Sequence, residues 1–210
     1  MNQYLLFSIL AFAAYLIGSI PSSVWIGKIF YGIDVREHGS GNAGTTNTIR
    51  VLGTTPGIVV FIIDVVKGFI AVSLAHLSGL PIGIDAFVNL QLSLAICAVL
   101  GHIFPLYARF RGGKGVATML GIIIAIQPIA AIVCFGVFVI ILAFSKYVSL
   151  SSMIAGISFP LLIIFVLNIH IVSLTIFSIA VSVLLILTHK KNIIRLINRE
   201  ENKFSFKKKV

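Results

Sequence analysis

The sequence predicts an all-α, polytopic integral membrane protein, and two observations support this class. Hydrophobic residues make up 59% of the 210 residues and charged residues only 10%, whereas a soluble globular domain carries about a quarter charged residues. Unbroken apolar runs of roughly 20 residues, the length that crosses a bilayer core, also recur along the chain. The alternating pattern of a membrane barrel is absent from the sequence.

Short polar loops separate the apolar segments, and their charges predict sidedness. The segments cover residues 4–30, 57–77, 86–107, 116–144, 148–167 and 169–188. Lysine and arginine occur after the first, third and fourth segments and in the tail, whereas residues 78–85 and 168–170 have neither. Because basic loops stay in the cytoplasm, these loops and the tail are expected to face inward.

The fourth segment decides the number of crossings. If residues 116–144 crossed once, Lys146 and the basic tail would face outward, against the positive-inside rule. Gln127 and Pro128 lie in its middle, and proline breaks a helix because it lacks a backbone donor and clashes with the preceding turn. We therefore predict seven transmembrane helices, some short or broken, with the N-terminus out and the C-terminus in. Residues 1–210 would form a single membrane-embedded domain with a basic cytoplasmic tail at about 198–210.

The net charge of +10, from 16 Lys+Arg and 6 Asp+Glu, does not indicate a nucleic-acid partner. The basic residues lie where the positive-inside rule puts them in any protein of the cytoplasmic membrane. Cys97 and Cys134 lie in apolar runs without metal-ligand spacing, so no metal site is predicted. Asp64 and Lys67, three residues apart in an apolar segment, indicate either a functional site or a local neutralising pair.

The first polar cluster, residues 34–50, is rich in glycine, serine, threonine and asparagine. Glycines let backbone N–H groups converge on one anion, and the short polar side chains add donors. Arg50 adds charge and a forked donor. Residues 39–44 match G-x-G-x-x-G, but no strand precedes them, so a dinucleotide site is excluded. A flexible linker is the alternative. We expect the cluster to bind a phosphorylated substrate where water meets lipid.

The second and third polar clusters are residues 101–118 and 188–195. In the second, Lys114 lies within a Gly-Gly-Lys-Gly sequence at the start of a helix, which favours an anion. An ordinary interfacial loop is the alternative, with His102 as a packed histidine. In the third, His189, Asn192 and Arg195 share one face of a helix. The alternative there is a basic tail that binds anionic lipids.

Together these clusters resemble the PlsY family of bacterial acyl-phosphate:glycerol-3-phosphate acyltransferases, over nearly the whole chain. The resemblance is carried by residues 18–21, 36–53, 64–68, 101–105 with 110–118, 147–150 and 189–195. One departure is Arg199, where the third motif of the family usually has glycine, followed by a glutamate that matches Glu201.

The resemblance implies a reaction, a location and partners. A fatty acyl group would pass from acyl phosphate to the 1-hydroxyl of glycerol 3-phosphate, giving lysophosphatidic acid and inorganic phosphate. This is the first step of bacterial phospholipid synthesis, at the cytoplasmic face of the inner membrane. No cofactor and no metal would be needed. Membrane lipid would surround the protein, and PlsX, which makes acyl phosphate, would be the upstream partner.

The residue types suit that chemistry. An acyl phosphate is already activated, so no covalent relay is required, and the sequence has no G-x-S-x-G motif. Lys114 and Arg50, with the N–H groups of residues 40–42, are expected to neutralise the leaving phosphate. His189 is expected to accept the hydroxyl proton, with the substrate phosphate as a rival base.

The expected site residues divide into two groups. The catalytic residues are His189, Lys114 and Ser40. The substrate-binding residues are Arg50, Gly41, Asn42, Thr46, Asn47, Gly112, Gly113, Gly115, Ser149, Asn192 and Arg195. We expect Arg50, Lys114 and Arg195 to converge at the inner leaflet around two phosphoryl groups. Gly18, Ser19 and Gly121 are candidates for close helix contacts or an acyl groove.

Two other classes of protein remain as alternatives. A transporter of a phosphorylated metabolite would also use glycine-rich breaks, but it predicts paired half-repeats and polar groups deep in the membrane. A lipid-binding scaffold would explain the basic tail but not the Gly-Gly-Lys-Gly sequence.

Overall fold

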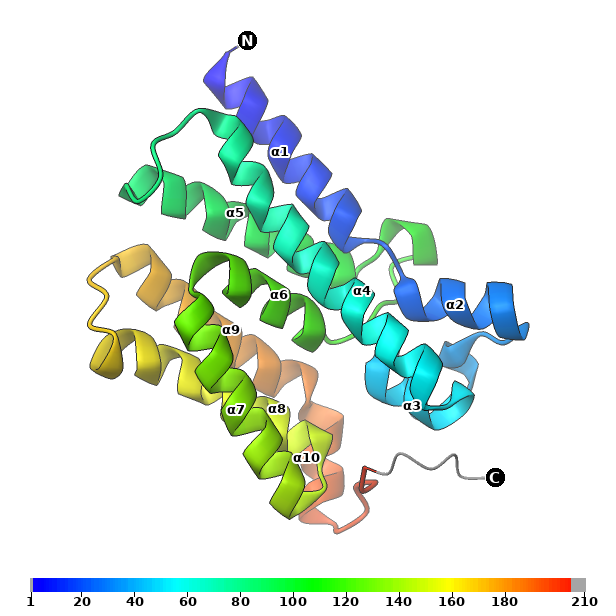
Figure 1. Cartoon of the computed structure of the whole chain (residues 1–210). Helices are drawn as coiled ribbons and strands as arrows, with labels where there is room; N and C mark the ends of the chain where they lie inside the picture. The colour runs from blue at the N-terminus through cyan, green and yellow to red at the C-terminus, as the bar shows by residue number, and fades with distance from the viewer. Residues whose placement is uncertain (1, 205–210) are drawn as a thin grey trace. The chain divides into compact units, whose positions relative to one another are not determined.

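The computed structural model describes residues 2–204, and within that range it contains helices and turns but no strand. The all-α class is therefore confirmed. The helices belong to two compact units, α1–α6 in the first and α7–α10 in the second, and each unit is described by itself (Figure 1). The expected basic residues Lys207, Lys208 and Lys209 lie outside the described residues, and the prediction of a single domain stays a prediction.

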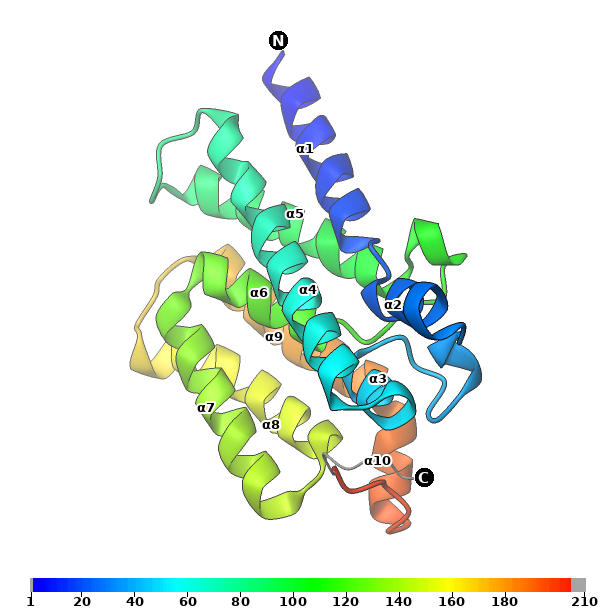
Figure 2. The same ribbon diagram turned by 45° about the vertical axis from the view of Figure 1, so that its right-hand side comes forward.

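In the first unit, α4 packs against α6 and α1 packs against α5, as both views show (Figure 1 and Figure 2). Three short 3₁₀ turns, η1 to η3, connect these helices. The bounds are α1 Gln3–Gly18, α2 Ser22–Tyr31, η1 Val35–Glu37, α3 Thr45–Leu52, α4 Thr54–Ser73, η2 Leu74–Ser78, α5 Asp85–Ile103, η3 Leu106–Ala108 and α6 Val116–Ile126.

The first apolar segment is not one straight helix. The structure divides residues 4–30 into α1 and α2, which are bent by 42°. Pro21 explains the break, because its ring disfavours helical backbone at Ile20 and it has no N–H to donate. The carbonyl of Pro21 then accepts from the N–H of Trp25 at 3.0 Å, which starts α2.

The fourth apolar segment is also divided, as predicted. Helix α6 ends at Ile126 and α7 (Pro128–Ser145) begins at Pro128, with Gln127 between them. Proline suits the first position of a helix, where an N–H would have no partner within the helix. In the described part of the chain, four helices are long and apolar enough to cross a membrane, or up to six if each bent pair is one span, and α6 is a shorter apolar helix. Seven crossings with the N-terminus out stay a prediction.

Helices of the first unit approach each other at glycines. A Cβ on Gly68 would overlap the carbonyl oxygen of Thr118, and one on Gly121 would overlap that of Val65, so α4 and α6 touch through their backbones. Likewise a Cβ on Gly18 of α1 would overlap the carbonyl oxygen of Ala98 in α5. Small residues permit such approach where lipid gives no hydrophobic drive for association. The expected close helix contacts at Gly18 and Gly121 are confirmed.

Asp64 and Lys67 of α4 form a buried ion pair that also serves the break between α1 and α2. Lys67 Nζ lies 2.7 Å from Asp64 Oδ1, and the two side chains are 4% and 2% exposed. The Ser22 hydroxyl donates to the same carboxylate at 2.8 Å. Lys67 donates to the carbonyl of Ile20 at 2.9 Å, inside the break. The pair thus neutralises itself and satisfies backbone that a bilayer cannot hydrate.

In the second unit, α8 packs between α7 and α9. Pro160 lies inside α8 and has no N–H, so the carbonyl of Gly156 loses its usual donor. The Ser182 hydroxyl of α9 donates to that carbonyl at 2.6 Å, which joins the two helices. The remaining bounds are α8 Val148–Leu161, the π-helical turn η4 Leu162–Val166, α9 Val172–Thr188 and α10 Lys190–Ile197.

Gly121→Ala should destabilise the protein by about 1–3 kcal/mol, because the added methyl group meets backbone that cannot move aside easily. Gly136→Ala in α7 is the matched control, since a Cβ there meets nothing within 4 Å. Thermal unfolding of both variants in detergent compares them. Equal stability of the two variants would contradict the contact between α4 and α6.

Ser182→Ala should lower the free energy of unfolding by about 1 kcal/mol, because the carbonyl of Gly156 loses its donor. In a Pro160→Ala background the penalty should be smaller, since that change restores a backbone N–H within α8. A double-mutant cycle of unfolding free energies measures the difference. A penalty of the same size in both backgrounds would show that Ser182 does not compensate for the proline.

Candidate active site

Asn47 folds the first polar cluster. Its side chain is buried, with the residue 2% exposed. Its Nδ2 group donates to the carbonyls of Val35 at 2.7 Å and His38 at 3.1 Å, and its Oδ1 accepts from the Ser40 N–H at 2.8 Å. A Cβ on Gly39 would overlap that same Oδ1, and Gly39 has φ +62°. Asn47 therefore shapes the loop, and both of its amide hydrogens are used for this.

The backbone of this loop differs from the expectation. We expected the N–H groups of residues 40–42 to converge on an anion. Instead the Ser40 N–H is donated to Asn47, and the Gly41 N–H is donated to the carbonyl of His38 at 3.1 Å. The expectation is wrong for these two groups, because a turn this tight closes on its own donors. Side chains remain available, since Ser40 is exposed and Asn42 is half-buried.

Helix α3 carries two further candidates on one face. Thr46 lies in its first turn and Arg50 four residues later in its last turn, and both are half-buried. Residues four apart are neighbours on a helix surface, so the hydroxyl and the guanidinium lie on the same side of α3. An arginine in the last turn also interacts favourably with the negative end of the helix.

The glycine loop, residues 112–115, packs against both α5 and the first polar cluster. The N–H groups of Gly112 and Gly113 are donated to the carbonyls of Ile103 and His102, each at 3.2 Å. A Cβ on Gly113 would overlap His102 Nε2 and lie 2.5 Å from the carbonyl oxygen of Ala43. The first two glycines are thus needed for close packing, and their N–H groups are not the expected anion donors. The same contact brings the first and second clusters together.

Two residues complete that loop. Lys114 is half-buried, and Gly115 adopts φ +81° directly before α6. A residue with a Cβ rarely adopts this conformation, so glycine suits the position. The backbone thereby turns from the loop into the N-terminus of a helix, where a negative charge is favourable.

His102 connects the glycine loop with the buried ion pair. It is 6% exposed, and its Nδ1 lies 3.0 Å from the Thr118 hydroxyl and 3.9 Å from Asp64 Oδ1. Thr118 belongs to α6, so the histidine joins the C-terminal end of α5 to the helix that follows the loop. The interpretation of His102 as a packed histidine fits this arrangement.

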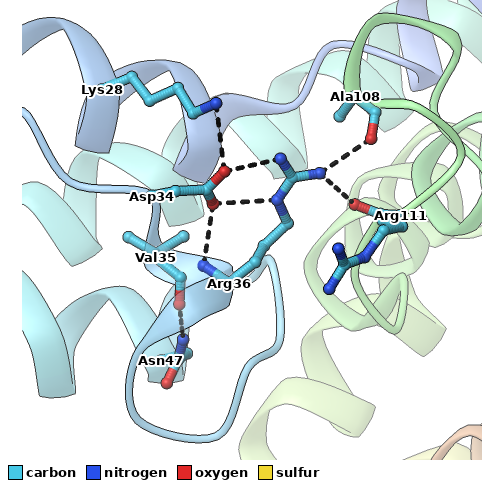
Figure 3. Close-up of polar contacts among 7 residues, drawn as sticks. All are labelled: Lys28, Asp34, Val35, Arg36, Asn47, Ala108 and Arg111. Atoms are coloured by element: carbon cyan, nitrogen blue, oxygen red, sulfur yellow. Dashed lines mark hydrogen bonds and ion pairs between the residues drawn. The ribbon is translucent and has the colours of Figure 1, made fainter.

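Arg36 makes contacts that the sequence did not reveal (Figure 3). Its Nε and Nη2 donate to the two carboxylate oxygens of Asp34, at 3.0 and 2.7 Å. Its Nη1 donates to the carbonyls of Ala108 at 2.8 Å and Arg111 at 3.3 Å. Lys28 lies 3.2 Å from the same carboxylate. The first cluster is therefore fastened to the segment that leads into the glycine loop.

The Asp34–Arg36 pair stays ionised at neutral pH. The hydrogen bonds from the Arg36 side chain hold the pKa of Asp34 well below its usual range, and the bond to Asp34 raises the pKa of Arg36. The pKa of the Asp34 carboxyl is lower in the folded protein than in the unfolded chain. The ionised pair therefore contributes to stability at neutral pH. That contribution is lost only as the pH falls below about 4, the value in the unfolded chain.

The third cluster is built around His189, which lies between α9 and α10 and is 3% exposed. Its Nδ1 lies 2.7 Å from the carbonyl oxygen of Leu185. Because a carbonyl only accepts, Nδ1 carries the hydrogen, and Nε2 therefore carries the lone pair of the neutral ring. This tautomer suits a proton acceptor at Nε2. The predicted helix that carries Asn192 and Arg195 is present as α10.

Glu201 joins two predicted site residues of the second unit. Its Oε1 accepts from the Ser149 hydroxyl at 2.8 Å and from Asn192 Nδ2 at 2.7 Å. The sequence identified Glu201 only as a match to the family. The only other signal is that Glu200 and Glu201 are carboxylates in a tail that is mostly basic. Arg195 belongs to the second unit, so its convergence with Arg50 and Lys114 stays a prediction. Within residues 2–204, no three His, Cys, Asp or Glu side chains could hold a metal ion.

Comparisons with known proteins identify the family. The model of the family described as glycerol-3-phosphate acyltransferase matches residues 8–199. The glycerol-3-phosphate acyltransferase of Enterococcus faecalis is 43% identical over 205 residues, covering 94% of this chain and 92% of the relative. Glycerol-3-phosphate acyltransferase 2 of Bacillus cereus is 43% identical over 212 residues, covering 100% and 98%. The chain belongs to the glycerol-3-phosphate acyltransferase family.

Solved structures place it within the PlsY branch of that family. The crystal structure of PlsY, an integral membrane glycerol 3-phosphate acyltransferase, in its glycerol 3-phosphate form has a TM-score of 0.86 and 38% identity. That comparison covers 95% of this chain and 96% of the other. The lysophosphatidic acid form has a TM-score of 0.83 and 36% identity, with the same coverage. This PlsY-family chain is thus a multi-pass membrane protein with acyltransferase relatives.

Asn47→Asp should lower the free energy of unfolding by about 2–3 kcal/mol, because a buried carboxylate would face the two carbonyls that now accept from the amide. Asn89→Asp makes the same chemical change at an exposed position of α5 and should have little effect. Thermal unfolding in detergent measures both variants. Two variants of similar stability would show that Asn47 does not hold the loop.

Proposed function

We propose that the chain transfers a fatty acyl group from acyl phosphate to the 1-hydroxyl of glycerol 3-phosphate. The products are lysophosphatidic acid and inorganic phosphate. The PlsY crystal structures support the acceptor and the product of this reaction, since one is a glycerol 3-phosphate form and the other a lysophosphatidic acid form. The observation that carries the proposal is the packing of Gly113 against Ala43. It brings the loop of Lys114 onto the cluster of Ser40 and Arg50.

The first unit handles the leaving group. The hydroxyl oxygen of glycerol 3-phosphate attacks the acyl carbonyl carbon, and the bond from that carbon to the phosphate oxygen breaks. The phosphate leaves with the electron pair, so negative charge grows on it. Lys114 and Arg50 neutralise this charge, and the exposed Ser40 hydroxyl and Asn42 amide donate to it. Positioned charges of this kind lower the barrier without a covalent intermediate.

The second unit handles the acceptor. Asn192 and Arg195 bind the phosphate and hydroxyls of glycerol 3-phosphate, and Ser149 assists. Glu201 fixes the Ser149 hydroxyl and the Asn192 amide through one carboxylate oxygen. His189 takes the hydroxyl proton at Nε2, the nitrogen that its bond to Leu185 leaves with the lone pair. A phosphate oxygen of the substrate is the rival acceptor of that proton.

The remaining parts of the proposal concern location and partners. The chain acts as one acyltransferase domain with seven transmembrane helices in the bacterial inner membrane, and its active site faces the cytoplasm. PlsX supplies the acyl phosphate. The transporter alternative gains no support from the buried pair of Asp64 and Lys67, because that pair is satisfied by its own partners and by Ile20.

The donor is tested with purified protein and labelled glycerol 3-phosphate. Palmitoyl phosphate should give lysophosphatidic acid and inorganic phosphate in equal amounts, whereas palmitoyl coenzyme A should give neither product. Release of phosphate without the lipid would indicate a hydrolase. Product formation from the thioester alone would overturn the proposed donor.

Lys114→Ala should lower turnover with palmitoyl phosphate by about 10²- to 10³-fold, because a preorganised charge at the leaving group is lost. His189→Ala should cause a loss of similar size if the imidazole is the base. Lys191→Ala removes an exposed charge from α10 and serves as the control for both. Initial rates measured on folded, monodisperse protein give the comparison.

The two variants have separate consequences. Near-normal turnover of Lys114→Ala would show that this lysine does not stabilise the leaving group. Near-normal turnover of His189→Ala would instead assign the base to a phosphate oxygen of the substrate.

A further inference from the structure

The segment before the glycine loop has an unusual backbone. Arg109 and Phe110 follow the short helix η3, and they adopt φ +55° and φ +57°. Residues with a Cβ rarely adopt this left-handed conformation, and two bulky residues in succession make it costly. Such a conformation persists only where the surrounding contacts hold it. Two sets of contacts hold residues 108–111 in it.

Backbone hydrogen bonds hold the segment from within. The Phe110 N–H is donated to the carbonyl of Pro105 at 2.9 Å, and the Arg111 N–H to that of Ala108 at 3.3 Å. These bonds form a turn but do not connect it to another part of the protein. The N–H groups of Gly112 and Gly113 connect the later residues to the end of α5.

Arg36 holds the segment from outside. Its Nη1 donates to the carbonyls of Ala108 and Arg111, which lie immediately before and after the two left-handed residues. Figure 3 shows the guanidinium between these carbonyls and the Asp34 carboxylate. The Asp34 carboxylate fixes the plane of the guanidinium by accepting from both Nε and Nη2. The side chains of Arg36 and Asp34 are only 12% and 9% exposed.

The contacts also argue against a direct role for Arg36 in binding substrate. A guanidinium has five N–H donors. Four of these are used, two on the carboxylate and two on the carbonyls. Its charge is already compensated by the same carboxylate, which also lies 3.2 Å from Lys28. Arg36 can therefore orient the chain around it, but only one of its N–H donors is left to bind a phosphate.

We infer that Arg36, fixed by Asp34, is a positioning residue that holds residues 108–111 in their left-handed turn and thereby sets the place of Lys114. The inference rests on the proposed role of Lys114 in the reaction. Lysine at this position would not substitute, because an ammonium is a point charge that cannot bridge a carboxylate and two carbonyls with fixed geometry.

The test combines hydrogen–deuterium exchange with kinetics on folded, monodisperse protein. Arg36→Met, Arg36→Lys and the milder Asp34→Asn should each speed exchange in residues 106–116 by about tenfold or more. Each should also lower kcat/KM for palmitoyl phosphate by about 10- to 100-fold, as expected when a charged group is misplaced. The double variant Arg36→Met/Asp34→Asn should lose no more activity than Arg36→Met alone, since Arg36 and Asp34 act as one unit.

Lys28→Met is the matched control. It removes only the outer ion pair to Asp34, in which the lysine is 54% exposed, so exchange and kcat/KM should stay close to those of the parent protein. Lys114→Ala is the second control, since it should lower turnover by about 10²- to 10³-fold without changing exchange in residues 106–111.

Each result decides a different point. Unchanged exchange in Arg36→Met overturns the inference, whatever happens to activity. Faster exchange with unchanged kcat/KM shows that the turn does not position a reacting group, which also overturns it. If Arg36→Lys keeps the exchange rate and the activity of the parent protein, the positive charge is sufficient and the forked geometry of the guanidinium is not needed. The inference then fails. Failure of the proposed reaction itself would appear separately, as no lysophosphatidic acid from palmitoyl phosphate in the parent protein, and full activity in Lys114→Ala would remove only the assigned role of that lysine.

Discussion

The breaks in the helices release backbone groups that a bilayer cannot hydrate, and much of the structure depends on how those groups are satisfied. Between α1 and α2 the Lys67 ammonium donates to the carbonyl of Ile20, and Asp64 neutralises the charge that this requires. Inside α8 the Ser182 hydroxyl replaces the donor that Pro160 lacks. Each replacement donor comes from another helix. The hydrogen bond that satisfies a carbonyl at a break therefore also fixes which helices pack together.

The same requirement shapes the candidate active site. Many of its polar residues are needed to build it: Asn47 closes the first loop, and the N–H groups of Gly112 and Gly113 fasten the second loop to α5. Among the predicted residues, Ser40 is exposed, and Lys114 and Arg50 are half-buried. A loop whose backbone is held by such hydrogen bonds can hold these side chains in fixed positions. That is the condition for electrostatic stabilisation without reorganisation.

The sequence predicted the features that depend on local composition. Long apolar runs revealed the helices, and Pro128 revealed the break between α6 and α7. The bend at residues 19–21 was missed, because the apolar pattern continues through it. Contacts distant in sequence were also missed. The carbonyl of Ala108 is 72 residues from Arg36, and a backbone carbonyl has no signature in the sequence. The loop N–H groups were expected to bind an anion, but those of Ser40 and Gly41 are donated within the protein. Composition shows which donors are present but not which acceptors they meet.

The end of the described chain contains a left-handed turn at a residue that is not glycine. Arg199 has φ +60°, in the region that favours glycine, and the family usually has glycine at this position. The turn brings the N–H groups of Glu200 and Glu201 to the carbonyl of Arg195, at 2.7 and 3.2 Å. It also directs Glu201 back to Ser149 and Asn192. All of these bonds are made with arginine at position 199. The turn therefore requires the left-handed backbone conformation, and it does not require that the side chain be absent. The substitution therefore adds local strain but keeps the carboxylate in contact with the two side chains that we assign to the acceptor substrate.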